Sequence, residues 1–229
     1  MKKIHILTTA VLAMTVLAIA PAQAATRYIT VNASGTVKVA PDAVRINGTV
    51  NVVAGNSKQA LADASSAMSK VRTALTSSGI ASKDLSTQSL TVYPEYNYTQ
   101  DKGSYIVGYR AQQTFIAIVR AAKNAGAVVD AAVAAGGDAL QVSGVTPFII
   151  DDAAATASAR SEAVKNAKAK ATSYAKLLGV KLKGVNFLTE NSSPSYVPML
   201  AMAKAADGAT EVDLGQQDVT VSITVQWAL

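Results

Sequence analysis

Polar and apolar residues alternate along two segments that lie far apart in the chain. In the segment 44–52 every second residue is apolar or glycine, and the residues between are Arg, Asn and Thr. In the segment 218–229 Val, Ile, Trp and Leu alternate with Asp, Thr, Ser and Gln. A period of two is typical of a β-strand that buries one face. We therefore predict two strands. Because the second strand places the end of the chain inside a sheet, we expect truncation within it to unfold the protein.

Five other segments contain enough β-branched and aromatic residues, between turn residues, to be predicted as strands. They are 27–39, 85–98, 105–119, 142–150 and 180–190.

The helical period of about 3.6 residues occurs in the segment 57–78. Asn56 or Ser57 is expected to cap this helix and Gly79 to end it. A shorter helix is predicted from about 123 to 135, where two glycines follow. The apolar positions of the first helix are Leu61, Ala64, Met68, Val71 and Leu75.

A third helix is predicted over 152–178, and Gly179 is expected to end it. Its apolar stripe consists mostly of alanine, which allows a neighbouring backbone to approach closely. The stripe is therefore predicted to pack on a sheet or on a copy of itself. Its predicted members are Ala155, Ala159, Ala163, Ala167 and Ala171, with Tyr174 and Leu178 at the far end.

The order of these elements is β-β-α-β-β-α-β-α-β-β, in which hairpins alternate with helical crossovers. This order predicts an α+β fold with a mainly antiparallel sheet, or sheets, backed by three helices. The segment 25–229 is predicted to form one domain, or two interlocked lobes.

The first 24 residues have the features of a cleaved signal peptide. Lys2 and Lys3 precede an apolar stretch over 4–19, and Ala22-Gln23-Ala24 is a small-x-small cleavage site. The sequence contains no Cys, so neither a lipoprotein anchor nor a disulfide is available. We therefore expect an exported, periplasmic protein.

The residue types that carry most enzyme chemistry are scarce. There is no Cys, and the one histidine, His5, lies in the predicted leader. Nucleophile systems that depend on imidazole and zinc sites with His ligands are excluded from the exported chain. We expect no enzymatic activity, no cofactor and no resident metal; the alternative is an enzyme that uses carboxylates only.

The formal net charge is +6, and basic residues are concentrated near the end of the third helix. Seven Lys and Arg residues and one Glu lie between Arg160 and Lys183. One interpretation is a solvated helix face whose basic side chains lie toward the C-terminal end of the helix, where the helix dipole stabilises positive charge. The other is a contact with an anionic membrane surface, for which Lys165, Lys168 and Lys176 are the candidates. Nucleic acid is not an expected partner of an exported protein.

Two further regions are candidates for ligand or subunit contacts. Five tyrosines lie on one predicted hairpin, where they either stabilise the strands by cross-strand pairing or form a stacking platform. The segment 191–215 has no clear period and is interpreted as either a flexible loop or a contact loop. The candidate residues are Tyr93, Tyr96, Tyr98, Tyr105 and Tyr109 on the hairpin, and Tyr196, Met199 and Met202 in the loop.

Several short motifs occur in an order that resembles the SIMPL-domain family. This family includes bacterial periplasmic immunogenic proteins and oxidative-stress defence proteins. The resemblance implies a compact α+β fold, export, and the large ring-like oligomers of some relatives; it implies no catalytic residues. The motifs are Ser34-Gly35-Thr36-Val37-Lys38-Val39-Ala40-Pro41-Asp42, Tyr93-Pro94-Glu95-Tyr96, Gly108-Tyr109-Arg110-Ala111, Gly144-Val145 with Phe148, Ala159-Arg160, Leu177-Leu178-Gly179 and Gly215-Gln216-Gln217.

These observations favour a non-enzymatic structural or interaction protein that self-assembles into a homo-oligomer, linked by the resemblance to the cell envelope and to stress defence. Strand edges, the Ala-rich helix and the 191–215 loop are the expected contacts. The alternative is a periplasmic binding module for a small molecule, a glycan or an anionic lipid.

Overall fold

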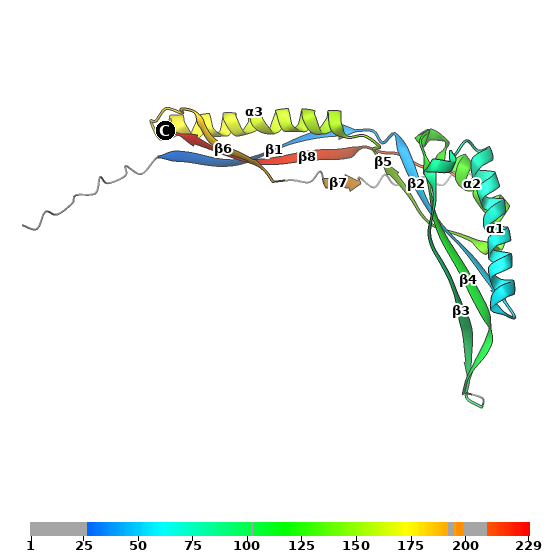
Figure 1. Ribbon diagram of the computed structural model, residues 1–229. Coiled ribbons are helices and arrows are strands. Elements are labelled where there is room, and N and C mark those ends of the chain that lie inside the picture. The colour runs from blue at the N-terminus through cyan, green and yellow to red at the C-terminus, as the bar shows by residue number, and fades with distance from the viewer. Residues whose placement is uncertain (1–26, 102, 192–194, 199–209) are drawn as a thin grey trace, which may run out of the picture.

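The computed structural model describes residues 27–101, 103–191, 195–198 and 210–229 (Figure 1). The predicted leader over 1–24 lies outside the described residues, as do Met199 and Met202. The strands are β1 (Tyr28–Val39), β2 (Ala43–Ala54), β3 (Leu85–Thr99), β4 (Gly103–Val119), β5 (Leu140–Phe148), β6 (Val185–Glu190), β7 (Ser195–Pro198) and β8 (Gln217–Ala228). The helices are α1 (Ser57–Ser77), α2 (Ala125–Gly136) and α3 (Ala153–Leu177), with 3₁₀ turns at Ser82–Asp84, Ala122–Asn124 and Gly137–Ala139.

The strands form two antiparallel sheets, which confirms the predicted α+β class. The first sheet has the order β3-β4-β2-β5. The second has the order β1-β8-β6, and β7 also pairs with β8. The molecule is bent where the two sheets meet, and the helices cover the outer side of the bend (Figure 1).

Helices α1 and α2 cover one face of the first sheet. The Asn56 side chain accepts a hydrogen bond from the backbone N–H of Gln59 at 2.9 Å and so caps α1 as predicted. The even-numbered residues of β2 from Val44 to Val50 are buried under the helices, and Val52 and Ala54 are partly buried. Phe115 of β4 fills the space beside Gly48, where a Cβ atom would lie 2.5 Å from the Phe115 ring. This core is therefore assembled from the alternating face predicted for 44–52.

Helix α3 packs on the second sheet through five alanines. Gly35 of β1 lies directly against the α3 backbone, at the carbonyl of Ala159 and the amide of Ala163. Only residues with little or no side chain allow this distance between helix and strand. The buried alanines are Ala159, Ala163, Ala167, Ala171 and Ala175. The stripe packs on a sheet of its own chain, which is one of the two predicted partners.

Three details of the helix prediction were wrong. Leu61 is 38% exposed, and Ala60 takes its place under α1. Tyr174 and Leu178 are exposed, because the inner stripe of α3 keeps a spacing of four residues and continues with Ala175. Ala155 is only partly buried.

The segment 191–215 contains structure that the sequence did not predict. Strand β7 lies within this segment and pairs with β8, which follows it. Val212 and Leu214 pack against the core of the first sheet, although β8, which they precede, belongs to the second. The side chain of Gln217 donates a hydrogen bond from Nε2 to the carbonyl of Pro147 at 2.7 Å. These contacts connect the two halves of the molecule.

Candidate functional site

The largest group of exposed large hydrophobic side chains in the described chain lies on the hairpin of β3 and β4. We call residues 90–110 the hairpin arm. It extends beyond the end of α1 and carries no helix over its outer part (Figure 1). Eight of the twenty exposed large hydrophobic side chains in the described residues belong to it: Leu90, Val92, Tyr93, Tyr96, Tyr98, Tyr105, Ile106 and Val107.

The tyrosines of the hairpin arm do not pair with one another across the strands. Tyr93 lies opposite Arg110, Tyr96 opposite Ile106, and Tyr98 opposite Ser104. Tyr105 and Tyr109 lie opposite Asn97 and Pro94. If these tyrosines stabilise the strands by cross-strand pairing, their directly opposite partners are therefore other residue types.

A shift of register explains part of this arrangement. It lies between Glu95 and Tyr96 and leaves one extra residue, Val107, on β4. As a result, Tyr105 and Tyr109, four residues apart on β4, lie opposite β3 residues only three apart. The arm therefore presents tyrosines on both of its faces, and Tyr98 and Tyr96 are 72% and 60% exposed.

One ion pair joins the two strands of the hairpin arm. Arg110 donates from Nε and Nη2 to the two carboxylate oxygens of Glu95, at 2.8 and 2.9 Å. These hydrogen bonds from Arg110 lower the pKa of Glu95 and, conversely, raise the pKa of Arg110. Two parallel bonds between planar groups fix the relative orientation of their side chains. The pair therefore holds the strands in register beside the shift.

The candidate lysines of α3 do not form one compact patch. Lys165 is 77% exposed and lies 3.7 Å from the carboxylate of Glu162. Lys168 and Lys176 directly follow the buried Ala167 and Ala175, as Arg160 follows the buried Ala159, and Arg160 is paired with Glu190 of β6. They therefore lie along the side of α3 that faces β6, whereas Lys165 points away from the sheet.

A second exposed apolar region lies where α3 ends and β6 begins. We call it the 174–188 patch. Leu177 and Leu178 are 79% and 66% exposed. The other exposed large hydrophobic residues of the patch are Tyr174, Val185, Phe187 and Leu188.

The two edges of the second sheet differ. On β1, the side chains of Asn166 and Lys170 donate hydrogen bonds to the carbonyls of Ser34 and Asn32, at 2.9 and 3.1 Å. These side chains partly cover that edge against pairing with another strand. On β6, the opposite side from β8 has no paired strand within the described ranges. Strand β6 therefore adds unpaired backbone groups to the 174–188 patch.

The remaining candidates lie in the 191–215 segment. Tyr196 lies in β7, opposite Val219 of β8, and Met199 and Met202 lie outside the described residues. Across the ranges that the structure covers, no three His, Cys, Asp or Glu side chains come close enough together to hold one metal ion. In the same ranges, no helix has the length and apolarity needed to cross a membrane.

This two-sheet α+β chain matches the SIMPL family model, described as a protein of unknown function (DUF541), over residues 29–227. The chain belongs to the SIMPL family. It is similar to the 26 kDa periplasmic immunogenic protein of Brucella melitensis, with 30% identity over 212 residues that cover 86% of this chain and 82% of the relative. It is also similar to the uncharacterized protein YggE of Escherichia coli K12, with 29% identity over 181 residues, or 78% of this chain and 72% of the relative.

The resemblance predicted from the sequence motifs is confirmed. The name of the Brucella relative supports a periplasmic location for this chain.

Proposed function

We propose that this protein is a non-enzymatic interaction protein of the periplasm that self-assembles into a homo-oligomer. Cleavage of the leader after Ala24 would release the exported chain. The link to envelope or oxidative-stress defence rests on the family resemblance and would be an indirect consequence of assembly.

The observation that carries this proposal is the exposure of large apolar side chains in two separate regions. Soluble monomers seldom expose extended apolar patches, and larger ones mark interaction surfaces. The hairpin arm and the 174–188 patch lie at opposite ends of the bent molecule (Figure 1). Since the two differ in sequence and in structure, the arm of one copy can meet the patch of the next in a heterologous contact. Strand β6 would add backbone hydrogen bonds at this contact.

We expect the double variant Tyr96→Ser and Tyr98→Ser to shift the protein from the oligomer to the monomer, with at least a tenfold weaker association. Removing these two side chains takes the most exposed aromatic surface from the contact. The measurement is the absolute mass of purified 25–229 by light scattering after size exclusion, at several concentrations.

The matched control removes two exposed apolar side chains from α1 and α2. Leu61 and Val133 are 38% and 44% exposed, so Leu61→Ser with Val133→Ser should leave the mass unchanged. A wild-type chain that is monomeric at every concentration would contradict self-assembly. An unchanged mass of the tyrosine variant would exclude the arm from the contact. Deletion of 191–213 is a poorer test, because it also removes β7 and the packed Val212.

Peripheral contact with an anionic membrane is a second candidate. It is favoured by the exposed Leu177 and Leu178 directly beside Lys176, since apolar side chains next to lysines suit the interface of an anionic bilayer. We expect the protein to sediment with vesicles rich in phosphatidylglycerol at low salt. The triple variant Lys165→Glu, Lys168→Glu and Lys176→Glu should lose at least nine tenths of this binding. Equal binding of wild type and variant, or binding by neither, would exclude the contact.

A further inference from the structure

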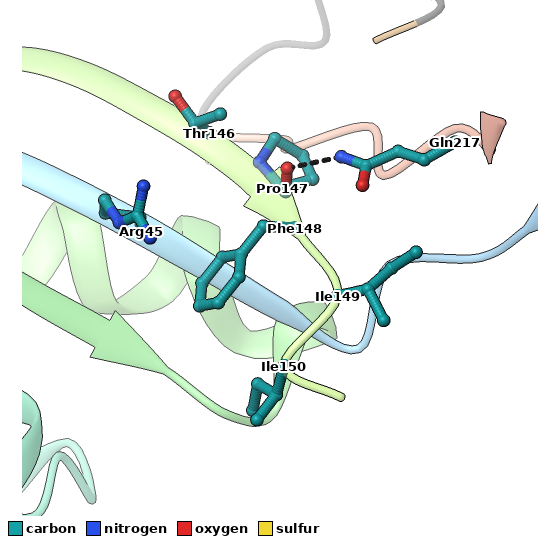
Figure 2. A pocket seen from close by; sticks show the side chains of 7 residues that line it. All are labelled: Arg45, Thr146, Pro147, Phe148, Ile149, Ile150 and Gln217. Atoms are coloured by element: carbon teal, nitrogen blue, oxygen red, sulfur yellow. Dashed lines mark hydrogen bonds between the residues drawn. The ribbon is translucent and has the colours of Figure 1, made fainter. Parts of the chain in front are cut away.

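A pocket lies at the bend between the two sheets. Its volume is about 510 Å³, within the range of about 300–1,000 Å³ that is usual for small-molecule sites. We call it the elbow pocket. Its lining comes from β2, from the end of β5 and the residues after it, and from the start of β8 (Figure 2). The lining residues are Arg45, Thr146, Pro147, Phe148, Ile149, Ile150 and Gln217.

Arg45 supplies a positive charge to this pocket. Its guanidinium carbon lies 4.8 Å from the centre of the Phe148 ring, a cation–π distance. Arg45 has no carboxylate partner within the part of the chain that the structure describes. By contrast, three other arginines each have one: Arg110 with Glu95, Arg120 with Asp84 and Arg160 with Glu190. The Arg45 guanidinium therefore retains its donors for an anion.

Gln217 supplies a polar group with an unmet acceptor. The residue is 5% exposed, and its Nε2 donates to the carbonyl of Pro147. Its Oε1 is buried and accepts no hydrogen bond from any residue that the structure describes. In Figure 2 the nitrogen faces Pro147 and the oxygen is turned away from it. Buried polar atoms normally have a partner, so an unpaired one requires an explanation.

Apart from Thr146, the remaining lining residues are apolar. Pro147, Phe148, Ile149 and Ile150 follow one another along the chain and line the pocket (Figure 2). A mostly apolar pocket with a few polar groups is the usual composition of a small-molecule site.

We propose that the elbow pocket binds an apolar carboxylate that carries an N–H donor next to the carboxylate. Arg45 would bind the carboxylate, since a guanidinium matches its two oxygens. Phe148 and the isoleucines would contact the apolar body. The ligand N–H would satisfy Oε1 of Gln217 after a small movement of that side chain, which is needed because this oxygen is buried. This inference does not depend on self-assembly.

Two sources provide such a group: a free N-acylated apolar amino acid and the C-terminal residue of a peptide. The probe is N-acetyl-L-phenylalanine, titrated into the 25–229 chain by isothermal calorimetry. A parallel titration uses a pentapeptide that ends in phenylalanine. Tighter binding of either one supports the proposal and assigns the source.

Two chemical controls test the recognised groups. N-acetyl-L-phenylalaninamide lacks the negative charge, and N-acetyl-N-methyl-L-phenylalanine lacks the N–H. We expect the first to bind at least tenfold more weakly than the probe, because it cannot pair with Arg45. The second should bind several-fold more weakly, since Gln217 Oε1 would remain without a donor.

Arg45→Met should weaken binding of the probe at least tenfold, whereas Arg72→Met on the exposed side of α1 should not change it. Thermal melting of both variants verifies the fold. No binding of the probe or the peptide at millimolar concentration would overturn the proposal. So would equal binding by wild type and Arg45→Met, or equal binding of the acid and its amide.

Discussion

Replacement of Gly35 by valine is expected to lower the free energy of unfolding by about 3 kcal/mol or more. A Cβ atom at this position would overlap the carbonyl of Ala159 and the amide of Ala163. These are backbone atoms within a continuous helix, so they cannot move aside as the end of a flexible side chain could. The helix would have to separate from β1, which would loosen the packing of the five buried alanines. The expected fall in the melting temperature is about 6–12 °C for a chain of this size.

Gly55→Val is the matched control for Gly35→Val. No atom lies within 4 Å of a Cβ placed at Gly55, so this substitution should change the free energy of unfolding by less than about 1 kcal/mol. Chemical denaturation of both variants, followed by circular dichroism, makes the comparison. Equal stabilities of the two variants would show that α3 does not pack closely on β1 at Gly35.

A chain that ends after Ile223 is expected to lose the folded second sheet. The deletion removes the end of β8, which lies between β1 and β6 and pairs with both. It also removes the buried side chains of Val225 and Trp227. Loss of one large buried side chain such as Trp costs about 3–5 kcal/mol, and whole domains are stable by only about 5–15 kcal/mol. The truncated chain should therefore show reduced β-sheet circular dichroism and rapid proteolysis of the segment 153–190.

Gln226→Ala is the control for this truncation. Gln226 lies on the face of β8 away from α3. Its amide nitrogen donates to Thr30 and its amide oxygen accepts from Asn186, both at 3.3 Å, so both hydrogen bonds are weak. The variant keeps the backbone pairing and the buried residues, so its melting temperature should stay within about 3 °C of the wild type. A truncated chain that melts cooperatively at the wild-type temperature would contradict the central role of β8.

The proposals for the elbow pocket and for the exposed apolar regions can be tested independently of each other. Arg45 belongs to neither the hairpin arm nor the 174–188 patch, so Arg45→Met should leave the oligomeric mass unchanged. Conversely, the Tyr96 and Tyr98 substitutions should leave the affinity for N-acetyl-L-phenylalanine unchanged. Failure of one proposal would therefore not count against the other.

The amino-acid sequence predicted the order and the approximate bounds of most elements, because these depend on local periods and turn residues. The helices end near Gly79 and Gly179, as expected, and both glycines have positive φ angles. The prediction failed where local patterns were ambiguous. On α1, the helical period allows either Ala60 or Leu61 as the buried residue. On α3, it allows either Tyr174 or Ala175. Close approach of a strand to α3 favours the smaller side chain.

The candidate site could be predicted only in part. The tyrosine cluster on a hairpin was visible in the sequence, but the pairing of its residues was not, because the extra residue at Val107 becomes apparent only when two strands are aligned. The elbow pocket gave no signal. Phe148 and Gln217 occur in two of the SIMPL-like motifs, but they and Arg45 are far apart in the sequence, and nothing in it indicates that the three lie together. Strand β7 was missed because four residues are too few to show a period.

By itself, the sequence determined the α+β class, the strand and helix periods, the expectation of export and the membership in the SIMPL family, since each follows from local pattern or motif order. Only the tertiary structure decided that the strands divide into two sheets and that β8 lies between β1 and β6. It alone placed the apolar arm and the 174–188 patch at opposite ends and brought three distant residues into one pocket. These features depend on contacts between segments separated by up to about two hundred residues, and no local period records which segments meet.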